Sequence, residues 1–217
     1  MRRKMLPKSK DLFASPDTSL LYDRILSYNH PWDILESLKE IIFNTGCHLP
    51  QEKYHKYGES IWISRRARVS ELATIHGPTI IMEGSDIRLG AFIRGGVLVG
   101  RGCVVGNSTE IKNSILFDRV QAPHFNYVGD SILGYRAHLG AGAVTSNVKS
   151  DRTPISIATP EGRIETGRKK LGAILGDSVE VGCGAVLCPG SIVGRDSIIY
   201  PLCRVRGVVG EGMRVKS

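Results

Sequence analysis

The segment that is richest in side chains able to do chemistry is APHFNYVGD, residues 122–130. Its histidine, His124, carries an imidazole that can accept a proton near neutral pH. A regular repeat of the chain, described below, is interrupted around residues 121–130. Because functional residues often lie where a regular scaffold is broken, we predict that His124 is a general base.

A second stretch, LGAGAVTSN at residues 139–147, follows closely. Together the two stretches read H-x-x-Y-x-G-D, then G-A-G, then an asparagine five residues beyond the second glycine. This pattern resembles the acetyltransferase domain of bifunctional glucosamine-1-phosphate N-acetyltransferase/UDP-N-acetylglucosamine pyrophosphorylase. The run TGRKKLGAI at residues 166–174 looks closer to the archaeal sugar-phosphate nucleotidylyltransferases that carry the same C-terminal domain. The resemblance covers residues 31–209.

The resemblance implies an acetyl-CoA-dependent N-acetyltransferase that acts on an amino-sugar phosphate, with His124 as the catalytic base. It also implies that Arg94 and Lys112 bind the substrate phosphate, and that Tyr127 and Asn147 contact the sugar. Arginine would grip a phosphate through its planar fork and lysine as a point charge. Taken singly, Arg94 and Lys112 are more often solvated surface charges, and the family alignment is what favours binding.

The acyl-CoA contacts of the family fall near Ala141, Cys183 and Pro201, and Lys170 matches a basic residue at the end of the family's loop. We interpret Cys183 as a packing or contact residue and not as a nucleophile, because no partner base lies near it in the sequence.

The chain departs from the bacterial enzymes at two positions. Val148 stands where they have a tyrosine, and His138 stands where they have an asparagine in the sugar pocket. His138 is therefore a candidate sugar-binding residue, and the identity of the sugar stays open. No nucleotidyltransferase domain with its Gly-rich loop precedes the repeats, so we expect no pyrophosphorylase activity. A separate nucleotidyltransferase could work alongside.

The chemistry that the resemblance implies is physically reasonable. Attack of an amine on a thioester requires removal of a proton as the new bond forms, and an imidazole suits that task. The oxyanion of the tetrahedral intermediate needs preorganised donors, which the backbone amides of the tight Gly140-Ala141-Gly142 turn could supply. No metal is required for this reaction.

The scaffold that must position these residues is visible as a six-residue period. An aliphatic or aromatic residue recurs at every sixth position: Ile63, Val69, Ile75, Ile81, Ile87, Ile93, Val99, Val105, Ile111 and Phe117. The register resumes at Leu133 and Leu139, and again at Leu175, Val181, Leu187, Val193, Ile199 and Val205.

A second and usually small residue follows each member of the series by four positions, as at Ala67, Ala73, Ala91, Cys103, Ala137 and Ala185. Only Ile115 and Gln121 resist this pattern. One large and one small inward position in every six fit a narrow triangular solenoid in which three hexads make one coil. We therefore predict a mainly β fold, a left-handed parallel β-helix of hexapeptide repeats with a short α-helical N-terminal segment.

Two places break the period. Phe117 and Leu133 are sixteen residues apart, which predicts a bulge or slip around residues 121–130. The stretch 146–172 fits no hexad, and we interpret it as a long loop that leaves the solenoid. The expected domains are thus an N-terminal helical segment, residues 1–60, and a β-helix acyltransferase domain, residues 61–217, with an inserted loop at 146–172.

The N-terminal segment has a different pattern. Pro31 could open a helix in which apolar residues from Ile34 to Ile42 share a face, with Gly46 as its stop, and residues 20–26 suggest a shorter helix. We expect this segment to cap the first coil.

Composition limits the partners. The formal net charge of +8 favours anionic ligands, without the aromatic interleaving typical of a nucleic-acid platform. Part of the positive charge lies in the first ten residues, at Arg2, Arg3, Lys4, Lys8 and Lys10. We interpret this stretch as a solvated end of the chain. No signal-peptide core and no transmembrane stretch are visible, and five cysteines without a C-x-x-C pair indicate reduced thiols, so we expect a cytoplasmic protein without a membrane partner.

Two other functions compete with acetyl transfer. Zinc enzymes of the γ-carbonic anhydrase class share this fold, but His124 and His138 do not reproduce their closely spaced histidine pair, so no metal site is predicted. A non-catalytic assembly or sugar-nucleotide-sensing module is the stronger alternative. We also expect a homotrimer, because the family's active sites lie between neighbouring subunits, where the loop 146–172 could reach across.

Overall fold

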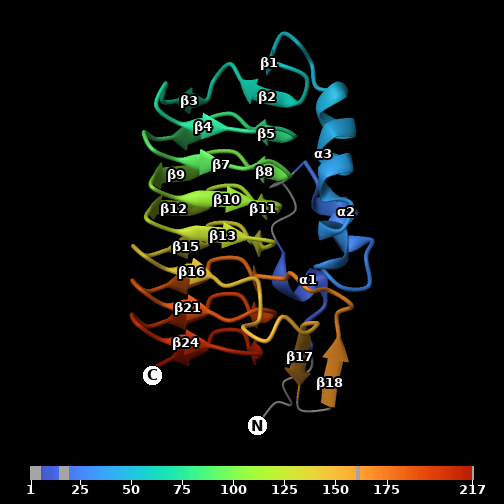
Figure 1. Cartoon of the computed structure of the whole chain (residues 1–217), viewed down its shortest axis with the longest axis vertical. Coiled ribbons are helices and arrows are strands. Elements are labelled where there is room, and N and C mark those ends of the chain that lie inside the picture. The colour runs from blue at the N-terminus through green and yellow to red at the C-terminus, as the bar shows by residue number, and fades with distance from the viewer. Residues whose placement is uncertain (1–5, 15–19, 160–161, 217) are drawn as a thin grey trace.

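Short parallel strands dominate the structure, a computed structural model that describes residues 6–14, 20–159 and 162–216. The strands form three sheets that wrap around one long axis (Figure 1). The chain visits the three sheets in turn, and each strand pairs with its counterpart one coil further along. The protein is a left-handed parallel β-helix, which confirms the predicted fold class.

Each sheet forms one side of the triangular solenoid. Sheet A consists, in spatial order, of β1 (Tyr54–Tyr57), β2 (Ile61–Ser64), β5 (Thr79–Ile81), β8 (Val97–Val99), β11 (Ser114–Leu116), β14 (Ile132–Leu133), β19 (Ala173–Leu175), β22 (Ser191–Val193) and β25 (Val208–Val209). Sheet B consists of β3 (Arg68–Val69), β6 (Asp86–Ile87), β9 (Val104–Asn107), β12 (Gln121–His124), β15 (His138–Leu139), β20 (Glu180–Val181), β23 (Ile198–Ile199) and β26 (Arg214–Val215). Sheet C consists of β4 (Thr74–Ile75), β7 (Phe92–Ile93), β10 (Glu110–Lys112), β13 (Tyr127–Gly129), β16 (Val144–Thr145), β21 (Val186–Leu187) and β24 (Arg204–Val205). We call the three edges of the solenoid the A–B, B–C and C–A corners.

The interior of the solenoid is the core that the six-residue period predicted. Its large members, such as Ile81, Val105 and Leu139, are fully buried, and so are small members such as Cys103 and Ala137. Burial raises the pKa of the Cys103 thiol far above its usual range, which fits a packing role. Because only neighbouring coils contact each other, this core is a continuous stack.

The break in the period lies elsewhere than predicted. Leu116 pairs with Val99 and points into the interior, whereas Phe117 lies outside and packs its ring against Phe13, with centroids 4.9 Å apart. The steps from Ile111 to Leu116 and from Val128 to Leu133 are each five residues, so two coils are one residue short at the C–A corner. The predicted bulge at 121–130 is wrong.

This register explains why Ile115 and Gln121 did not fit the pattern of small inward residues. Ile115 points outward from sheet A and is buried there, and Val120 takes the small inward position next to the exposed Gln121. The strand that carries His124 stays in regular register with the previous coil, because Ala122 pairs with Val105. His124 therefore occupies an ordinary corner of the solenoid.

The N-terminal segment covers the outer face of sheet A. It contains α1 (Ser9–Leu12), α2 (Tyr22–Leu26), the 3-10 helix η1 (Asp33–Leu35) and α3 (Leu38–Cys47). These helices run alongside the coils (Figure 1). Their apolar residues form a second core with the outward side chains Ile80, Leu98, Ile115, Ile132, Ile174 and Ile192.

The segment was expected to cap the first coil, but its helices cover the outer face of sheet A, because large apolar side chains there need a cover. β1 instead pairs antiparallel with β2 at the edge of sheet A. The helix expected to open at Pro31 begins at Leu38, after η1, and ends at Cys47, next to the predicted stop at Gly46.

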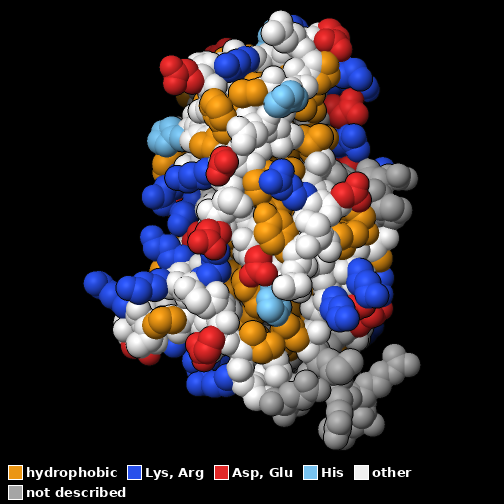
Figure 2. All heavy atoms as spheres, turned by 90° about the vertical axis from the view of Figure 1, so that its right-hand side faces the viewer, with side chains coloured by type: hydrophobic (Ala, Val, Ile, Leu, Met, Phe, Trp, Pro, Cys, Tyr) orange, Lys and Arg blue, Asp and Glu red, His pale blue; other side chains and the backbone are white. Residues whose placement is uncertain are grey.

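The basic start of the chain is partly anchored. Arg2, Arg3 and Lys4 lie outside the described residues. Lys8 and Lys10 are exposed, as expected, but Lys8 precedes α1 and Lys10 lies in it, and this helix buries Leu12 and leads into the buried Phe13. On the face that the helices form, basic, acidic and hydrophobic side chains are interspersed (Figure 2).

The stretch 146–172 holds a β-hairpin of β17 (Ser156–Thr159) and β18 (Gly162–Glu165). It leaves sheet C after β16 and returns to sheet A at β19. Ile155 and Ile157 in its first arm are buried, and a Cβ at Gly190 would lie 2.9 Å from Ile155 Cγ2. The expected free loop thus packs back onto its own solenoid at the C–A corner.

The described part of the chain contains no helix with the length and apolar character needed to span a bilayer. All five cysteines are free thiols.

Candidate functional site

His124 lies at the B–C corner, where β12 ends. It pairs with Asn107 of the previous coil, and its carbonyl accepts a hydrogen bond from the amide of Gly142, at 3.1 Å, in the next coil. The turn that contains Ala141 therefore lies directly below His124. The structure brings the predicted base next to the first of the predicted acyl-CoA contacts.

The other two acyl-CoA candidates continue the same column. The amide of Gly184 donates to the carbonyl of Ala141 at 2.9 Å, and the amide of Leu202 donates to the carbonyl of Cys183 at 2.9 Å. A Cβ at Gly182 would lie 2.4 Å from the nitrogen of Pro201, which shows how closely these turns stack. Ala141, Cys183 and Pro201, distant in sequence, thus form one ladder below His124.

The His124 side chain is exposed, and its ring centroid lies 6.4 Å from that of Phe125. Among the described residues, its ring has no hydrogen-bond partner. The backbone around it is held by Asn126, which is 1% exposed. Asn126 Oδ1 accepts from the amide of His124 at 3.2 Å, and its Nδ2 donates to the carbonyls of Gly140 (2.8 Å) and Ala143 (3.1 Å).

Two of the three proposed oxyanion donors are already engaged. The amide of Gly140 donates to the carbonyl of Val181 at 2.7 Å, and that of Gly142 donates to His124. Within the described residues only the Ala141 amide of this turn has no acceptor. The expectation that all three amides are available is therefore wrong, and Ala141 is the remaining candidate.

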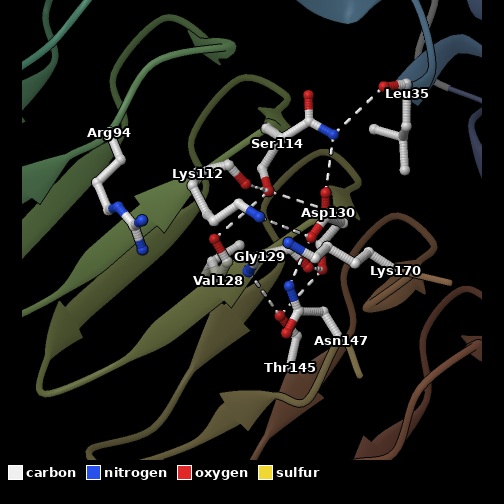
Figure 3. A network of polar contacts seen from close by, with 12 residues as sticks. Leu35, Arg94, Lys112, Ser114, Val128, Gly129, Asp130, Thr145, Asn147 and Lys170 are labelled. Atoms are coloured by element: carbon white, nitrogen blue, oxygen red, sulfur yellow. Dashed lines mark hydrogen bonds and ion pairs between the residues drawn. The ribbon is translucent and has the colours of Figure 1, made fainter. Parts of the chain in front are cut away.

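A second group of candidates gathers at the C–A corner, on the other edge of sheet C. Lys112 ends β10, Tyr127 begins β13 and Asn147 follows β16, so three successive coils contribute. Lys112 and Asn147 share a partner, Asp130, whose side chain is 5% exposed. Asp130 Oδ2 accepts from Lys112 Nζ at 3.1 Å and from Asn147 Nδ2 at 2.5 Å (Figure 3).

Tyr127 joins this group across a glycine. A Cβ at Gly129 would lie 2.6 Å from the Tyr127 hydroxyl and 2.9 Å from Asn147 Nδ2, so the absence of a side chain lets these groups approach each other. Burial raises the pKa of Tyr127, and the carboxylates of Asp130 and Glu110 raise it further. The phenol therefore stays protonated at neutral pH and can donate a hydrogen bond.

Arg94 lies one coil before Lys112 on the same edge, because its amide donates to the carbonyl of Ile111 at 2.8 Å. Its Nη1 donates to Glu110 Oε1 at 2.6 Å. This hydrogen bond and the charge of Glu110 raise the pKa of Arg94. Figure 3 shows Arg94 set apart from the Asp130 group.

Lys170 lies where the stretch 146–172 returns to the solenoid. The amide of Leu171 donates to the carbonyl of Asn147 at 3.0 Å, and that of Gly172 donates to the carbonyl of Asp130 at 2.8 Å. These bonds carry the Lys170 side chain toward the Asp130 group (Figure 3). Lys170, predicted as an acyl-CoA contact, is thus placed with the sugar and phosphate candidates within one chain.

His138 lies apart from both groups. It belongs to β15 on sheet B, in register with Gln121, and its Nδ1 is 2.8 Å from Glu180 Oε2. One chain therefore does not bring His138 to Tyr127 and Asn147. Among the described residues, no group of three or more His, Cys, Asp or Glu side chains is placed to hold a metal ion.

A cavity of about 390 Å³ opens beneath the hairpin, next to Asn147. It is lined by Ser146, Val148 and Cys188, and by three cations, Lys149, Arg163 and Arg206. Such a lining can bind an anionic group. Sequence reasoning missed this cavity, because it depends on how the hairpin folds back.

Sequence reasoning also gave no role to Asp130, Asn113, Asn126 and Glu110, although Asp130 and Asn126 lie in the most informative segment. The sequence does contain a signal for Asn113 and Asp130. Each lies in a step of five residues between inward positions, Ile111 to Leu116 and Val128 to Leu133, where other steps have six.

Comparison with known proteins adds a family match. Residues 75–189, just over half of the chain, match the model of the GMPPB C-terminal domain. The chain is 35% identical over 105 residues to the bifunctional sugar-1-phosphate nucleotidylyltransferase/acetyltransferase of Sulfurisphaera tokodaii, a match that covers 48% of this chain and 26% of that protein. It is 34% identical over 193 residues to the bifunctional protein GlmU of Methanocaldococcus jannaschii, covering 81% of this chain and 43% of that protein.

The chain thus spans less than half the length of these relatives. Among solved structures, it is similar to the acetyltransferase domain of PglB from Neisseria gonorrhoeae FA1090 in complex with acetyl coenzyme A. That match has 16% identity and a TM-score of 0.33, and it covers 72% of this chain and 54% of that one.

Proposed function

The chain belongs to the family of the GMPPB C-terminal domain, and on that premise we propose that it transfers the acetyl group of acetyl-CoA to the amine of an amino-sugar phosphate resembling glucosamine 1-phosphate. The similar protein of Sulfurisphaera tokodaii, a bifunctional sugar-1-phosphate nucleotidylyltransferase/acetyltransferase, supports this reaction class. The observation that carries the proposal is the column at the B–C corner, in which the exposed His124 stands above Ala141, Cys183 and Pro201.

In the proposed reaction the amine nitrogen attacks the thioester carbonyl carbon. A C–N bond forms, the C–S bond breaks, and His124 takes the proton that the amine loses and returns it to the leaving thiolate. The Ala141 amide, which donates to no other described residue, is available for the developing oxyanion. The column below His124 offers a path for the pantetheine arm of acetyl-CoA.

The acceptor phosphate would bind to Lys112 and Arg94, and the sugar to Tyr127 and Asn147, as the family resemblance implies. Both cations already pair with carboxylates of their own chain, Asp130 and Glu110. A bound phosphate would share these cations with the carboxylates. An ammonium has three donors and a guanidinium has five, so sharing leaves donors for the ligand.

We further propose a homotrimer with active sites between subunits. Four hydrophobic side chains at the B–C corner are more than half exposed, and they lie in line with the His124 column: Leu72, Leu89, Phe125 and Leu202. Several exposed apolar side chains along one edge are typical of an interaction site. A neighbouring subunit covering this edge would also bring its own side chains, His138 among them, toward the site.

A cytoplasmic location is part of the proposal and is supported by the five free thiols. A nucleotidyltransferase as a working partner is also proposed, because the Sulfurisphaera tokodaii relative is a bifunctional nucleotidylyltransferase/acetyltransferase.

The proposal is tested by incubating the purified protein with acetyl-CoA and a panel of amino-sugar phosphates and measuring release of the free thiol. Turnover that depends on one phosphorylated acceptor is expected. No thiol release with any acceptor, from a protein that binds one of them in calorimetry, would favour the second candidate, a non-catalytic sugar-nucleotide-sensing or assembly module. The lack of an orienting partner for the His124 ring is the observation that favours this alternative.

A further inference from the structure

Asp130 holds the polar side chains of the C–A corner together. Its Oδ2 accepts from Lys112 Nζ and Asn147 Nδ2, and its Oδ1 accepts from Asn113 Nδ2 at 2.9 Å (Figure 3). Because the carboxylate is almost fully buried, losing these partners would be costly, and its position fixes theirs. The two donors on Oδ2 are the residues to which the proposed function gives the acceptor phosphate and sugar.

Asn113 connects Asp130 to the N-terminal segment. The side-chain nitrogen of Asn113, Nδ2, carries two hydrogens. It donates one to Asp130 and the other to the carbonyl of Leu35, at 3.3 Å. Leu35 is buried and is the last residue of η1, where a helix leaves carbonyls without intrahelical partners. Asn113 thus fixes Asp130 from the side opposite to Lys112 and Asn147.

The backbone explains why these two residue types occur here. Asn113 and Asp130 have φ values of 44° and 49°, in the left-handed region that favours glycine but tolerates Asn and Asp. The amide of Asn113 donates to Gly95, which has φ 83° one coil earlier. At their two shortened corners, Asn113 and Asp130 thus occupy the position that Gly95 has in the preceding coil, and their side chains bind each other.

From these contacts we propose that Asp130 and Asn113 are positioning residues for the acceptor. They hold the Lys112 ammonium and the Asn147 amide in the geometry that a phosphorylated sugar needs, without touching the sugar themselves. This inference rests on the proposed function.

The first test compares Asp130→Asn and Asn113→Gly with the unchanged protein in the thiol-release assay. Both replacements keep the left-handed backbone accessible, so they change the side-chain contacts alone. We expect the KM for the phosphorylated acceptor to rise roughly 3–10-fold in each, as the loss of about one hydrogen bond predicts. The kcat and the KM for acetyl-CoA should stay within about twofold.

Asp118→Asn is the matched control. Asp118 is also a buried aspartate at a solenoid corner, but it lies at the A–B corner and pairs with Arg101. It should leave all three kinetic constants unchanged. Unchanged acceptor KM in both test variants, or an equal rise in the KM for both substrates, would overturn the positioning role. Absence of turnover in the unchanged protein would instead count against the proposed function.

A second measurement is independent of catalysis. The rate at which N-hydroxysuccinimidyl acetate labels each lysine is followed by mass spectrometry of tryptic peptides. Lys112 should be labelled faster in Asp130→Asn, which removes its charged partner, and in Asn113→Gly, which removes a donor that fixes that partner, than in the unchanged protein. The exposed Lys56 should keep its rate. Equal Lys112 rates in all three proteins would overturn the inference.

Discussion

The side-chain amide of Asn126 donates to the carbonyl of Gly140 at 2.8 Å, and this bond ties the turn that carries His124 to the turn of the next coil. The same nitrogen also donates to Ala143, and the side-chain oxygen accepts from the amide of His124. One buried residue thus sets the spacing between the proposed base and the Ala141 amide.

Asn126→Ala should therefore lower both stability and activity. It removes the Asn126 bonds to the carbonyl of Ala143 and the amide of His124, and it leaves the carbonyl of Gly140 with the Ala143 amide alone. The loss costs about 1–3 kcal/mol for each group that stays buried without a partner. We expect a clear fall in the thermal unfolding temperature and a lower kcat. Asn107→Ala, at the same corner one coil earlier, removes two exposed bonds, one to the carbonyl of Leu89 and one from the Ser108 hydroxyl, and is the control. Equal effects of the two variants would contradict the bridging role.

His124→Ala should keep the fold, because the side chain is exposed and lies outside the interior core. Loss of general-base catalysis should lower kcat roughly 10²–10⁴-fold, with little change in acetyl-CoA binding. His55→Ala, an exposed histidine on β1, should behave like the unchanged protein. A folded His124→Ala protein with normal kcat would remove His124 from the mechanism.

Lys112→Ala should raise the KM for the phosphorylated acceptor by the equivalent of roughly 1.5–3 kcal/mol, as expected for a lost charge-assisted contact. It should also destabilise the fold, because Asp130 stays buried with one donor fewer. Arg94→Ala should shift the acceptor KM in the same direction with little loss of stability, since its partner Glu110 is one-third exposed. Equal effects on the KM for acetyl-CoA would show that these residues belong to another pocket. Arg88→Ala removes a surface ion pair with Asp86 and is the control.

Asp118→Asn should change how stability depends on pH. Burial raises the pKa of Asp118, although hydrogen bonds and the charge of Arg101 oppose this. A carboxyl group whose pKa is raised on folding binds its proton more tightly in the folded state, so stability falls as pH rises from the unfolded pKa to the folded one. The variant should thus gain stability relative to the unchanged protein as pH rises above the ordinary aspartate pKa of about 3.9. Thermal unfolding of both proteins across this range measures the difference, and a relative loss with rising pH would contradict the assignment.

Phe125→Asp combined with Leu202→Asp should shift the proposed trimer toward monomer. Both side chains project from the B–C corner at positive φ and are exposed, so a charge there is tolerated in a monomer and is costly in an interface. Analytical ultracentrifugation gives the assembly state. Leu26→Asp, on α2 at the outer face of sheet A, is the control. A trimer that survives the double change would place the interface elsewhere.

The pattern of residue types along the chain was enough to predict the solenoid. Inward positions recur every six residues because each flat side and its corner use six, and a narrow interior accepts only particular sizes of side chain. That local rule placed Ile81, Val105 and Leu139 correctly. The spacing from His124 to Asn147 likewise predicted the family, which the match over residues 75–189 confirms.

The three-dimensional fold decided what the period could not. A sixteen-residue interval is consistent with one bulge or with two corners that each lose a residue, and only pairing between coils distinguishes them. The pairing shows that Leu116 and Leu133 both point inward, which moves Phe117 outside and brings Asn113 next to Asp130. Whether two side chains one coil apart are in contact depends on the exact number of residues in every corner between them. A local sequence pattern does not give that total length.

The segment that covers sheet A could not be predicted from a local pattern either. The pattern of outward apolar residues such as Ile80 and Leu98 does not indicate which segment packs on them. The apolar helical face of residues 34–42 could pack on any apolar surface of suitable width. The burial of Ile157 by the hairpin is likewise a long-range choice. Hydrophobic burial is non-directional, so the sequence determined which faces must be covered, and the tertiary structure decided which segment covers them.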